Sequence, residues 1–259
     1  MRNADQGAAQ MDNFVFDQTN SQGELLHMKD NLAAFFRDEI VSGRLKPGEK
    51  IVEIRWAKKL GLSQTSVREA LNILSAEGFV QKGSGRTAQV TQLSDEDIVH
   101  SYELRAVLEG YAARVVAENK PDLAPLEQAL EDMRSAIQCH NLKAFYERDL
   151  KFHVLVAEMT GNKILVHALK RIILPIFAFV VIRVQGARNN QEQWKRSLDQ
   201  HKRIIDALKT HDPVFAERIV IQSVDSFLKE TRTMVGAAEE GTRRRVLARA
   251  EFRIGMSAT

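Results

Sequence analysis

The chain has 259 residues, enough for two domains of ordinary size, and 44% of them are hydrophobic, which allows packed cores. Its formal net charge of +3 permits an anionic partner without requiring one, and its single cysteine, Cys139, excludes an internal disulfide framework and is typical of the reducing cytoplasm. No apolar run reaches the roughly 18 residues of a membrane span, and the N-terminal segment lacks the cationic start and apolar stretch of a secretory signal.

The first part of the chain alternates between helical patterns and turns. Residues 1–20 are polar and aperiodic, and we expect a disordered tail there. Apolar residues then recur at three- and four-residue steps over 25–42, which predicts a helix. A Pro-Gly pair at 47–48 breaks the pattern, and a second, shorter helix is expected over about 52–60, before Gly61.

A third helix is predicted from Ser63 to about residue 77, and a glycine again follows it. Two short strands, at 79–80 and 89–91, flank the sequence KGSGRT, which is typical of a polar hairpin tip. Three helices followed by a hairpin are the element order of a winged helix-turn-helix. Residues 21–93 are therefore expected to form a DNA-binding domain.

The third helix carries the residue types that a DNA-reading helix needs. Its apolar residues share one face, so Gln64, Thr65 and Arg68 project to the other side. Ser63 is a suitable N-cap, and the short side chains of SQTS allow the helix end, with its free N–H groups, to approach a phosphate closely. Arg68, the lone cation here, can pair with guanine or with a phosphate. The alternative is an ordinary cap followed by a solvated arginine.

After residue 93 the pattern is helical almost to residue 236, with breaks that divide it into six or seven helices. We expect residues 94–236 to form an all-helical antiparallel bundle, which makes the protein mainly α. Residues 237–259 are a basic tail, and either a disordered end or an arm that contacts phosphates would explain it. The DNA-binding part carries only a small excess of cations, so tight binding is expected to need two copies.

Two helical segments of the bundle contain residues that suit a metal. Asp149 and His153 lie four residues apart and share a helical face, and His201 begins another apolar-periodic run. One carboxylate and two imidazoles are a plausible ligand set for a first-row transition metal such as zinc. The alternative is an ordinary hydrogen bond between neighbours on a helix. A metal-dependent enzyme that uses these three residues is a second functional hypothesis, but it leaves the SQTSVREAL segment unexplained.

The stretch LGLSQTSVREALNILSAEGFV resembles the DNA-binding segment of the GntR family of bacterial regulators, whose pattern is roughly L-G-V-S-R-T-P-V-R-E-A-L followed by L-x-x-x-G-L-V. The resemblance implies DNA contacts at Ser63, Gln64, Thr65, Ser66 and Arg68, and at the wing tip near Arg86. Gln64 stands where arginine is usual, and Ser66 where proline is usual. Because glutamine pairs with adenine rather than guanine, we expect the operator to differ from the family's usual one.

Residues 94–235 resemble the helical FCD ligand-binding domain of the FadR-like branch of this family, through YELRAVLEGYAARVVA, DLKFHVLVAEMTGN and QHKRIIDAL. The resemblance implies that Asp149, His153 and His201 hold a divalent metal, with Ser223 near the place of a fourth ligand that is usually histidine. Arg105, Asn162 and Arg183 are the candidate contacts of a small organic acid effector. Internal salt bridges for the two arginines, and a helix C-cap for Asn162, are the alternatives.

Together these features predict a cytoplasmic, homodimeric DNA-binding transcription regulator, a repressor rather than an enzyme. Its expected partners are double-stranded operator DNA and a small carboxylate metabolite. An architectural DNA binder with no effector is a third hypothesis, in which the helical domain serves only for dimerisation.

Overall fold

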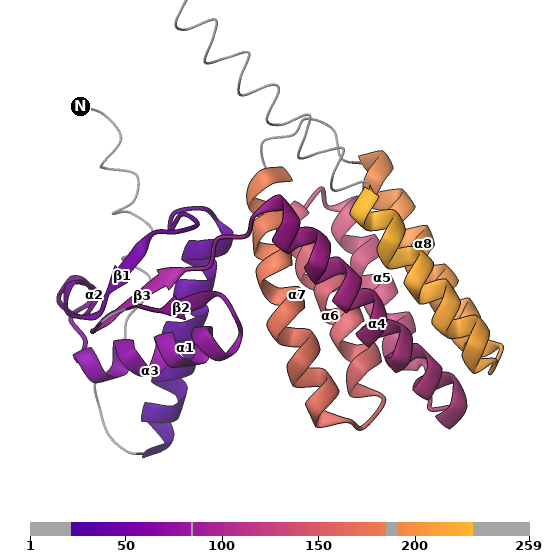
Figure 1. Cartoon of the computed structure of the whole chain (residues 1–259), viewed down its shortest axis with the longest axis horizontal. Coiled ribbons are helices and arrows are strands. Elements are labelled where there is room, and N and C mark those ends of the chain that lie inside the picture. The colour runs from indigo at the N-terminus through magenta and orange to yellow at the C-terminus, as the bar shows by residue number, and fades with distance from the viewer. Residues whose placement is uncertain (1–21, 84, 185–190, 230–259) are drawn as a thin grey trace, which may run out of the picture.

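The computed structural model describes residues 22–83, 85–184 and 191–229, with side chains from residue 29 onward and not over 179–184 or at 191. The described chain forms an N-terminal unit of helices and a small sheet, followed by a C-terminal bundle of helices (Figure 1). The predicted fold class is confirmed. The two predicted tails, 1–20 and 237–259, lie outside the described residues.

The N-terminal unit has the predicted order of helices, but its sheet has three strands rather than two. Its elements are α1 (Gln22–Val41), β1 (Lys50–Val52), α2 (Glu53–Leu60), α3 (Gln64–Ala76), β2 (Val80–Lys82) and β3 (Thr87–Val90). The antiparallel sheet has the order β1-β3-β2, with Ile51 opposite Ala88. β1 escaped prediction because three residues carry no readable period, and its pairing partner lies almost 40 residues away.

One core holds this unit together, because the apolar faces of α1 and α3 pack on the sheet. Phe36, Ile51 and Leu74 are fully buried there. The ring of Phe36 also meets Trp56 of α2 edge to face, with centroids 5.1 Å apart. Gly61 ends α2 with a φ of 67°, which lets the chain turn into α3 within three residues. This packing leaves the N-terminal end of α3 at the surface.

Six helices form the C-terminal bundle over the described residues. They are α4 (Asp95–Asn119), α5 (Ala124–Gln138), α6 (Leu142–Glu158), α7 (Lys163–Val184), α8 (Gln191–Lys209) and a helix over 213–229. α4 begins with a capping box between Ser94 and Asp97. Within the described ranges no helix combines the length and apolar character that a membrane crossing requires, and this includes α7.

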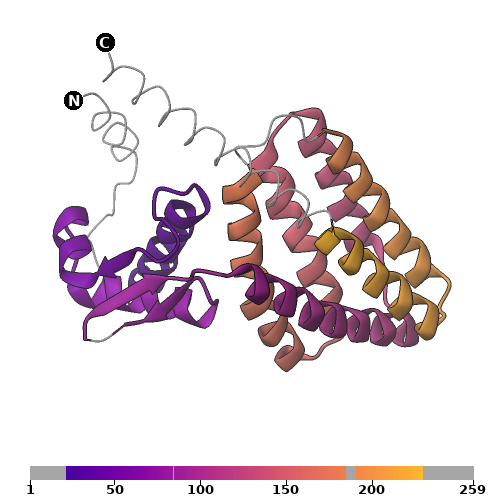
Figure 2. The same ribbon diagram turned by 45° about the horizontal axis from the view of Figure 1, so that its top comes forward.

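The two units meet along α7, which Figures 1 and 2 both show as the bundle helix beside the N-terminal unit. Gly78, just after α3, lies so close to α7 that an added Cβ would stand 2.8 Å from the carbonyl oxygen of Arg171. Pro175 lies inside α7 and has no N–H to donate to that carbonyl, so the carbonyl of Arg171 lacks its usual donor within the helix. The tight glycine turn and the proline therefore define how closely the units approach.

Candidate nucleic-acid interface and metal centre

The N-terminal end of α3 is built as the sequence predicts. The hydroxyl of Ser63 accepts a hydrogen bond from the backbone N–H of Ser66 at 3.0 Å, which confirms Ser63 as the N-cap. Val67 and Leu71 are buried on the opposite face, whereas Thr65 is exposed. The cap thus holds several short polar side chains and free N–H groups at one exposed helix end, where an anion is favoured.

Arg68 is not the unpaired cation that the sequence suggests. Its Nη2 lies 3.0 Å from a carboxylate oxygen of Glu53, the first residue of α2, and its Nε also donates to that carboxylate. The Arg68 side chain keeps 44% of its exposure, whereas that of Glu53 keeps only 9%. Arg68 is therefore held in place by a buried acid while part of its guanidinium stays available to a partner.

Glu53 also contacts Gln64 and, through its backbone, the wing residue Arg86. Gln64 Nε2 donates to Glu53 Oε2 at 3.0 Å, and Gln64 Oε1 accepts from Nη1 of the exposed Arg86 at 3.4 Å. The backbone N–H of Glu53 donates to the carbonyl of Arg86 at 3.3 Å. Hydrogen bonds from Arg68 outweigh burial and, with that from Gln64, hold the pKa of Glu53 below its ordinary value. Sequence reasoning gave Glu53 no role in the site, although it is visible as an acid at a helix start.

The bundle contains a second group of polar residues, buried between α4, α6 and α8. All are at most 6% exposed, and we refer to them as the polar cluster: Arg105, Glu109, Asp149, His153 and His201. Charged groups are almost never fully buried unless they are paired or bind a ligand or metal. The cluster is therefore the feature of the bundle that packing alone does not explain.

Three of these residues bring their ligand atoms together. His201 Nε2 lies 3.0 Å from Asp149 Oδ1 and 3.2 Å from His153 Nε2, and all three ligand atoms lie within 4.8 Å of one another. His153 Nδ1 lies 2.6 Å from Glu109, and His201 Nδ1 lies 2.7 Å from the carbonyl of Ser197. Because an outer partner occupies each Nδ1, both Nε2 atoms face Asp149, as in metal-binding histidines.

The electrostatics of the polar cluster separate the two histidines. Burial lowers the pKa of His153 below its ordinary value. Burial acts the same way on His201, but the neighbouring Asp149 carboxylate outweighs it and raises the pKa of His201. Burial would raise the pKa of Glu109, yet Arg105 and His153 lower it to about 2. The pKa shifts of the two histidines thus have opposite directions, and the Asp149 carboxylate beside His201 accounts for the upward one.

The residues of the cluster fit a metal held by three protein ligands. One carboxylate and two imidazole Nε2 atoms form the type of set that leaves a position open for water or an exogenous ligand. Ser223, the residue expected near the fourth position, lines the same cavity, which has a volume of about 10 Å³. A neutral hydroxyl is a weak ligand beside imidazole, so the open position suits an added oxygen ligand.

Arg105 has a partner for only part of its guanidinium. Its Nε pairs with Glu109, and its charge lies 5.5 Å from the centroid of the Phe177 ring. The internal salt bridge considered from the sequence is thus present. Arg105 Nη1, however, is buried and has no hydrogen-bond acceptor among the described residues. A buried N–H group without an acceptor is costly and points to a partner that the protein does not supply.

Of the other two predicted effector contacts, the structure describes only the side chain of Asn162, which does not join the cluster. Asn162 is exposed, and its side-chain oxygen accepts from the N–H groups of Ile164 and Leu165, so it is an N-cap of α7 rather than a C-cap. The side chain of Arg183 lies outside the described residues. Sequence reasoning missed Glu109 and Ser197, although each lies four residues from a predicted site residue on the same helix face.

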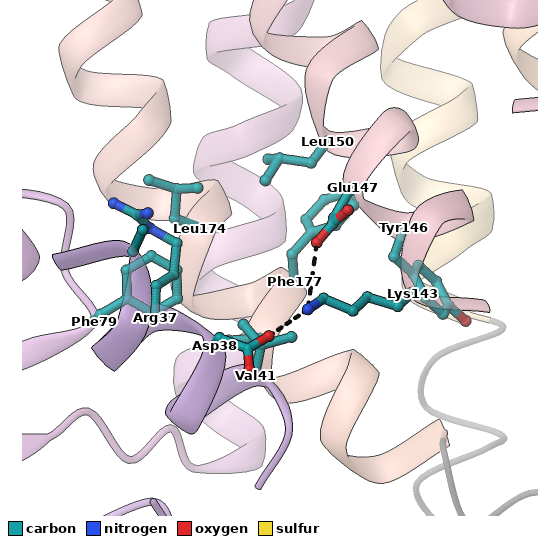
Figure 3. A pocket seen from close by; sticks show the side chains of 12 residues that line it. Arg37, Asp38, Val41, Phe79, Lys143, Tyr146, Glu147, Leu150, Leu174 and Phe177 are labelled. Atoms are coloured by element: carbon teal, nitrogen blue, oxygen red, sulfur yellow. Dashed lines mark hydrogen bonds and ion pairs between the residues drawn. The ribbon is translucent and has the colours of Figure 1, made fainter. Parts of the chain in front are cut away.

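A larger cavity, of about 260 Å³, lies where the N-terminal unit meets the bundle (Figure 3). We refer to it as the junction cavity. Phe79 lines it from the N-terminal unit and Phe177 from α7, and Lys143 at its rim pairs with Asp38 of α1. The Phe177 ring also lies 6.4 Å from that of His153. Phe177 therefore separates the junction cavity from the polar cluster and contacts groups on both sides.

Comparisons with known proteins match both units. The family described as "Bacterial regulatory proteins, gntR family" matches residues 29–90, and the "FCD domain" matches 100–226. The transcriptional repressor NanR of Escherichia coli is 30% identical over 64% of this chain and 69% of its own length. A probable D-xylose utilization operon transcriptional repressor of Paenarthrobacter nicotinovorans is 28% identical over 78% and 87%. The solved structure of E. coli McbR/YncC has a TM-score of 0.68 at 18% identity, covering 80% and 98%.

Proposed function

Because the chain belongs to the GntR family of bacterial regulators and carries an FCD domain, we propose that it is a cytoplasmic, homodimeric repressor that responds to a small carboxylate. Residues 21–93 bind double-stranded operator DNA, and residues 94–236 bind the effector and form the dimer. The observation that carries the sensing role is Arg105, whose buried Nη1 has no acceptor among the described residues and lies beside three side chains that could hold a metal.

The DNA-binding mode follows from the exposed end of α3. This end enters the major groove, where Gln64 and Arg68 reach base edges and the capped turn of Ser63, Thr65 and Ser66 approaches phosphates. Arg86 at the wing tip adds a second point of contact with the backbone. Two copies then bind half-sites about one helical turn, or ~34 Å, apart. This arrangement offsets the small cation excess of a single copy.

The effector site combines the metal and Arg105. Asp149, His153 and His201 hold a divalent metal such as zinc, which when bound supplies a Lewis-acid position for a carboxylate oxygen. Arg105 donates from Nη1 to the same carboxylate. The cavity of about 10 Å³ holds no more than one water, so an organic acid must displace part of its wall. Ser223 and Phe227 line that wall, so the helix over 213–229 is the element that moves.

Phe177 offers a route from this site to the DNA-binding part. Its ring contacts Arg105 on one side and lines the junction cavity on the other, opposite Phe79. An effector that changes the position of Arg105 therefore changes the packing between the units. To act as a switch, it must bind one arrangement of the units more tightly than another.

A band-shift experiment with the promoter next to the protein's own gene tests the proposal. We expect specific binding that weakens steeply with salt, and a shift in affinity when one member of a small-acid library also raises the melting temperature. Absence of salt-sensitive, specific binding to any genomic fragment would refute the regulatory function. Specific binding without any effector would favour the architectural binder instead.

A further inference from the structure

Glu53 occupies a position in the N-terminal unit that core packing does not explain. Glu53 is only 7% exposed, yet it begins α2 beside the exposed N-terminal end of α3. Its carboxylate contacts Gln64 and Arg68, the two residues proposed to reach base edges. Its own backbone N–H binds the wing at Arg86. The inference drawn from this geometry rests on the proposed DNA-binding function and concerns which base pair that function reads.

The two neighbours of Gln64 have opposite hydrogen-bonding character. An ionised carboxylate only accepts, so Glu53 can face only the amide nitrogen of Gln64. A guanidinium only donates, so Arg86 can face only the amide oxygen. The observed contacts, at 3.0 Å and 3.4 Å, follow this rule. A glutamine between an acceptor and a donor has one favourable amide orientation, whereas a solvated glutamine has two.

This orientation leaves a defined pattern for a base. The amide nitrogen of Gln64 has two N–H groups, and only one of them donates to Glu53. The amide oxygen has two lone pairs, and only one of them accepts from Arg86. One donor beside one acceptor matches the N7 and N6 groups of adenine in the major groove. The contact of Arg86 is the longer of the two, and it uses only one lone pair, so the other lone pair of the amide oxygen stays open to a base.

We propose that Glu53 is a specificity-determining positioning residue, which fixes the amide of Gln64 so that the protein selects adenine at one operator position. Glu53 touches no base itself. It acts through Gln64, and at the same time it holds the Nε edge of Arg68 and leaves the rest of that guanidinium to the DNA.

The test is an operator selection with the full-length protein, followed by affinities for the preferred site and for sites changed at the selected adenine. Glu53→Gln keeps the size of the side chain but can donate as well as accept, so it no longer fixes the amide. We expect the wild-type preference for adenine, about tenfold or more, to fall severalfold in this variant when both proteins are compared at the same low salt concentration.

Glu77→Gln is the matched control. It removes another acid of the same unit, which pairs through three hydrogen bonds with Arg37 at the far end of α3. Its adenine preference should equal that of the wild type even if its melting temperature falls. A double-mutant cycle is completed by adding Glu53→Gln to a Gln64→Ala variant. In that variant, Glu53→Gln should cause no further loss of adenine preference. If Glu53→Gln lowers the adenine preference as much in the Gln64→Ala variant as in the wild type, the proposal is overturned.

Arg86→Ala keeps the proposal testable if Glu53→Gln fails to fold. It removes the donor on the other side of Gln64 and leaves the Glu53–Arg68 pair intact, so we expect a weaker but measurable loss of adenine preference. Full preference in every variant that folds would contradict the role of Glu53 and leave DNA binding standing. A wild-type protein that selects no DNA sequence would instead contradict the proposed function itself.

Discussion

At the scale of single residues, the same pair of residue types has different energetic roles in two places on α4. Arg105 and Glu109 form a buried i,i+4 pair with side chains 3% exposed, whereas Arg114 and Glu118 form the same pair at the surface, 49% and 47% exposed. Breaking a buried pair leaves an uncompensated charge, but an exposed pair is screened by water. Burial, not sequence spacing, decides what each pair contributes.

We therefore expect Glu109→Gln to lower the free energy of unfolding by about 3–5 kcal/mol, because Arg105 loses its counter-charge. Glu118→Gln should change it by at most ~1 kcal/mol. Urea denaturation of both variants and the wild type measures the difference. Similar losses in both variants would show that the Arg105–Glu109 pair is not buried in solution.

The two histidines of the cluster allow a direct test of metal binding. Removing one of three ligands costs more affinity than the roughly 10–100-fold that loss of an outer partner costs, so His153→Ala should lose zinc that the wild type retains. His167→Ala, which changes an exposed histidine of α7, should keep it. Metal content after dialysis gives the answer. Equal zinc content in wild type and His153→Ala would exclude this residue as a ligand.

Part of the site could be predicted from the sequence, for reasons that differ between residues. Asp149 and His153 were readable because they lie on one helix at the i,i+4 spacing, and His201 because it begins another apolar-periodic run. Glu53 and Ser197 were not, because their roles depend on contacts between different elements or on a backbone carbonyl. Asn162 was read as a possible C-cap, yet it begins the next helix, since a glycine before an asparagine suits either role.

At the scale of elements, helices were predictable and strands were less so. A helix of several turns repeats its apolar period, whereas β1 has three residues and forms only by pairing with β3. The contact between Gly78 and α7 was also hidden, because a glycine after a helix signals an end and says nothing of what approaches it. This contact provides a prediction about how the two units are joined.

Gly78 and Gly61 both have positive φ, 83° and 67°, but only Gly78 lies against another element. Gly61→Ala should cost about 1–2 kcal/mol of backbone strain alone. Gly78→Ala should cost more, because its Cβ would meet the carbonyl of Arg171, and it should make the segment between β3 and α4 more sensitive to proteolysis. Denaturation and limited proteolysis compare the two variants, and equal effects on both readouts would contradict a tight contact in solution.

At the scale of the whole molecule, the account requires that the effector site and the DNA-binding part influence each other. Phe177 is the shared wall between the polar cluster and the junction cavity (Figure 3). We expect Phe177→Leu to bind the effector with little change, since the polar groups remain, but to lose most of the effect of the effector on operator affinity. Calorimetry and band shifts separate the two quantities. An unchanged response would place the coupling elsewhere.

The central claim is that Arg105 binds the carboxylate of the effector and that this binding changes the affinity of the protein for operator DNA. The most direct measurement is operator affinity of the zinc-loaded protein as a function of an effector acid, for the wild type and for Arg105→Lys. Lysine keeps a positive charge beside Glu109 but has a single nitrogen, so it cannot also place a donor at the position of Nη1. We predict at least a fivefold change of affinity in the wild type and almost none in the folded variant. The same response at the same effector concentration in both proteins would contradict the account.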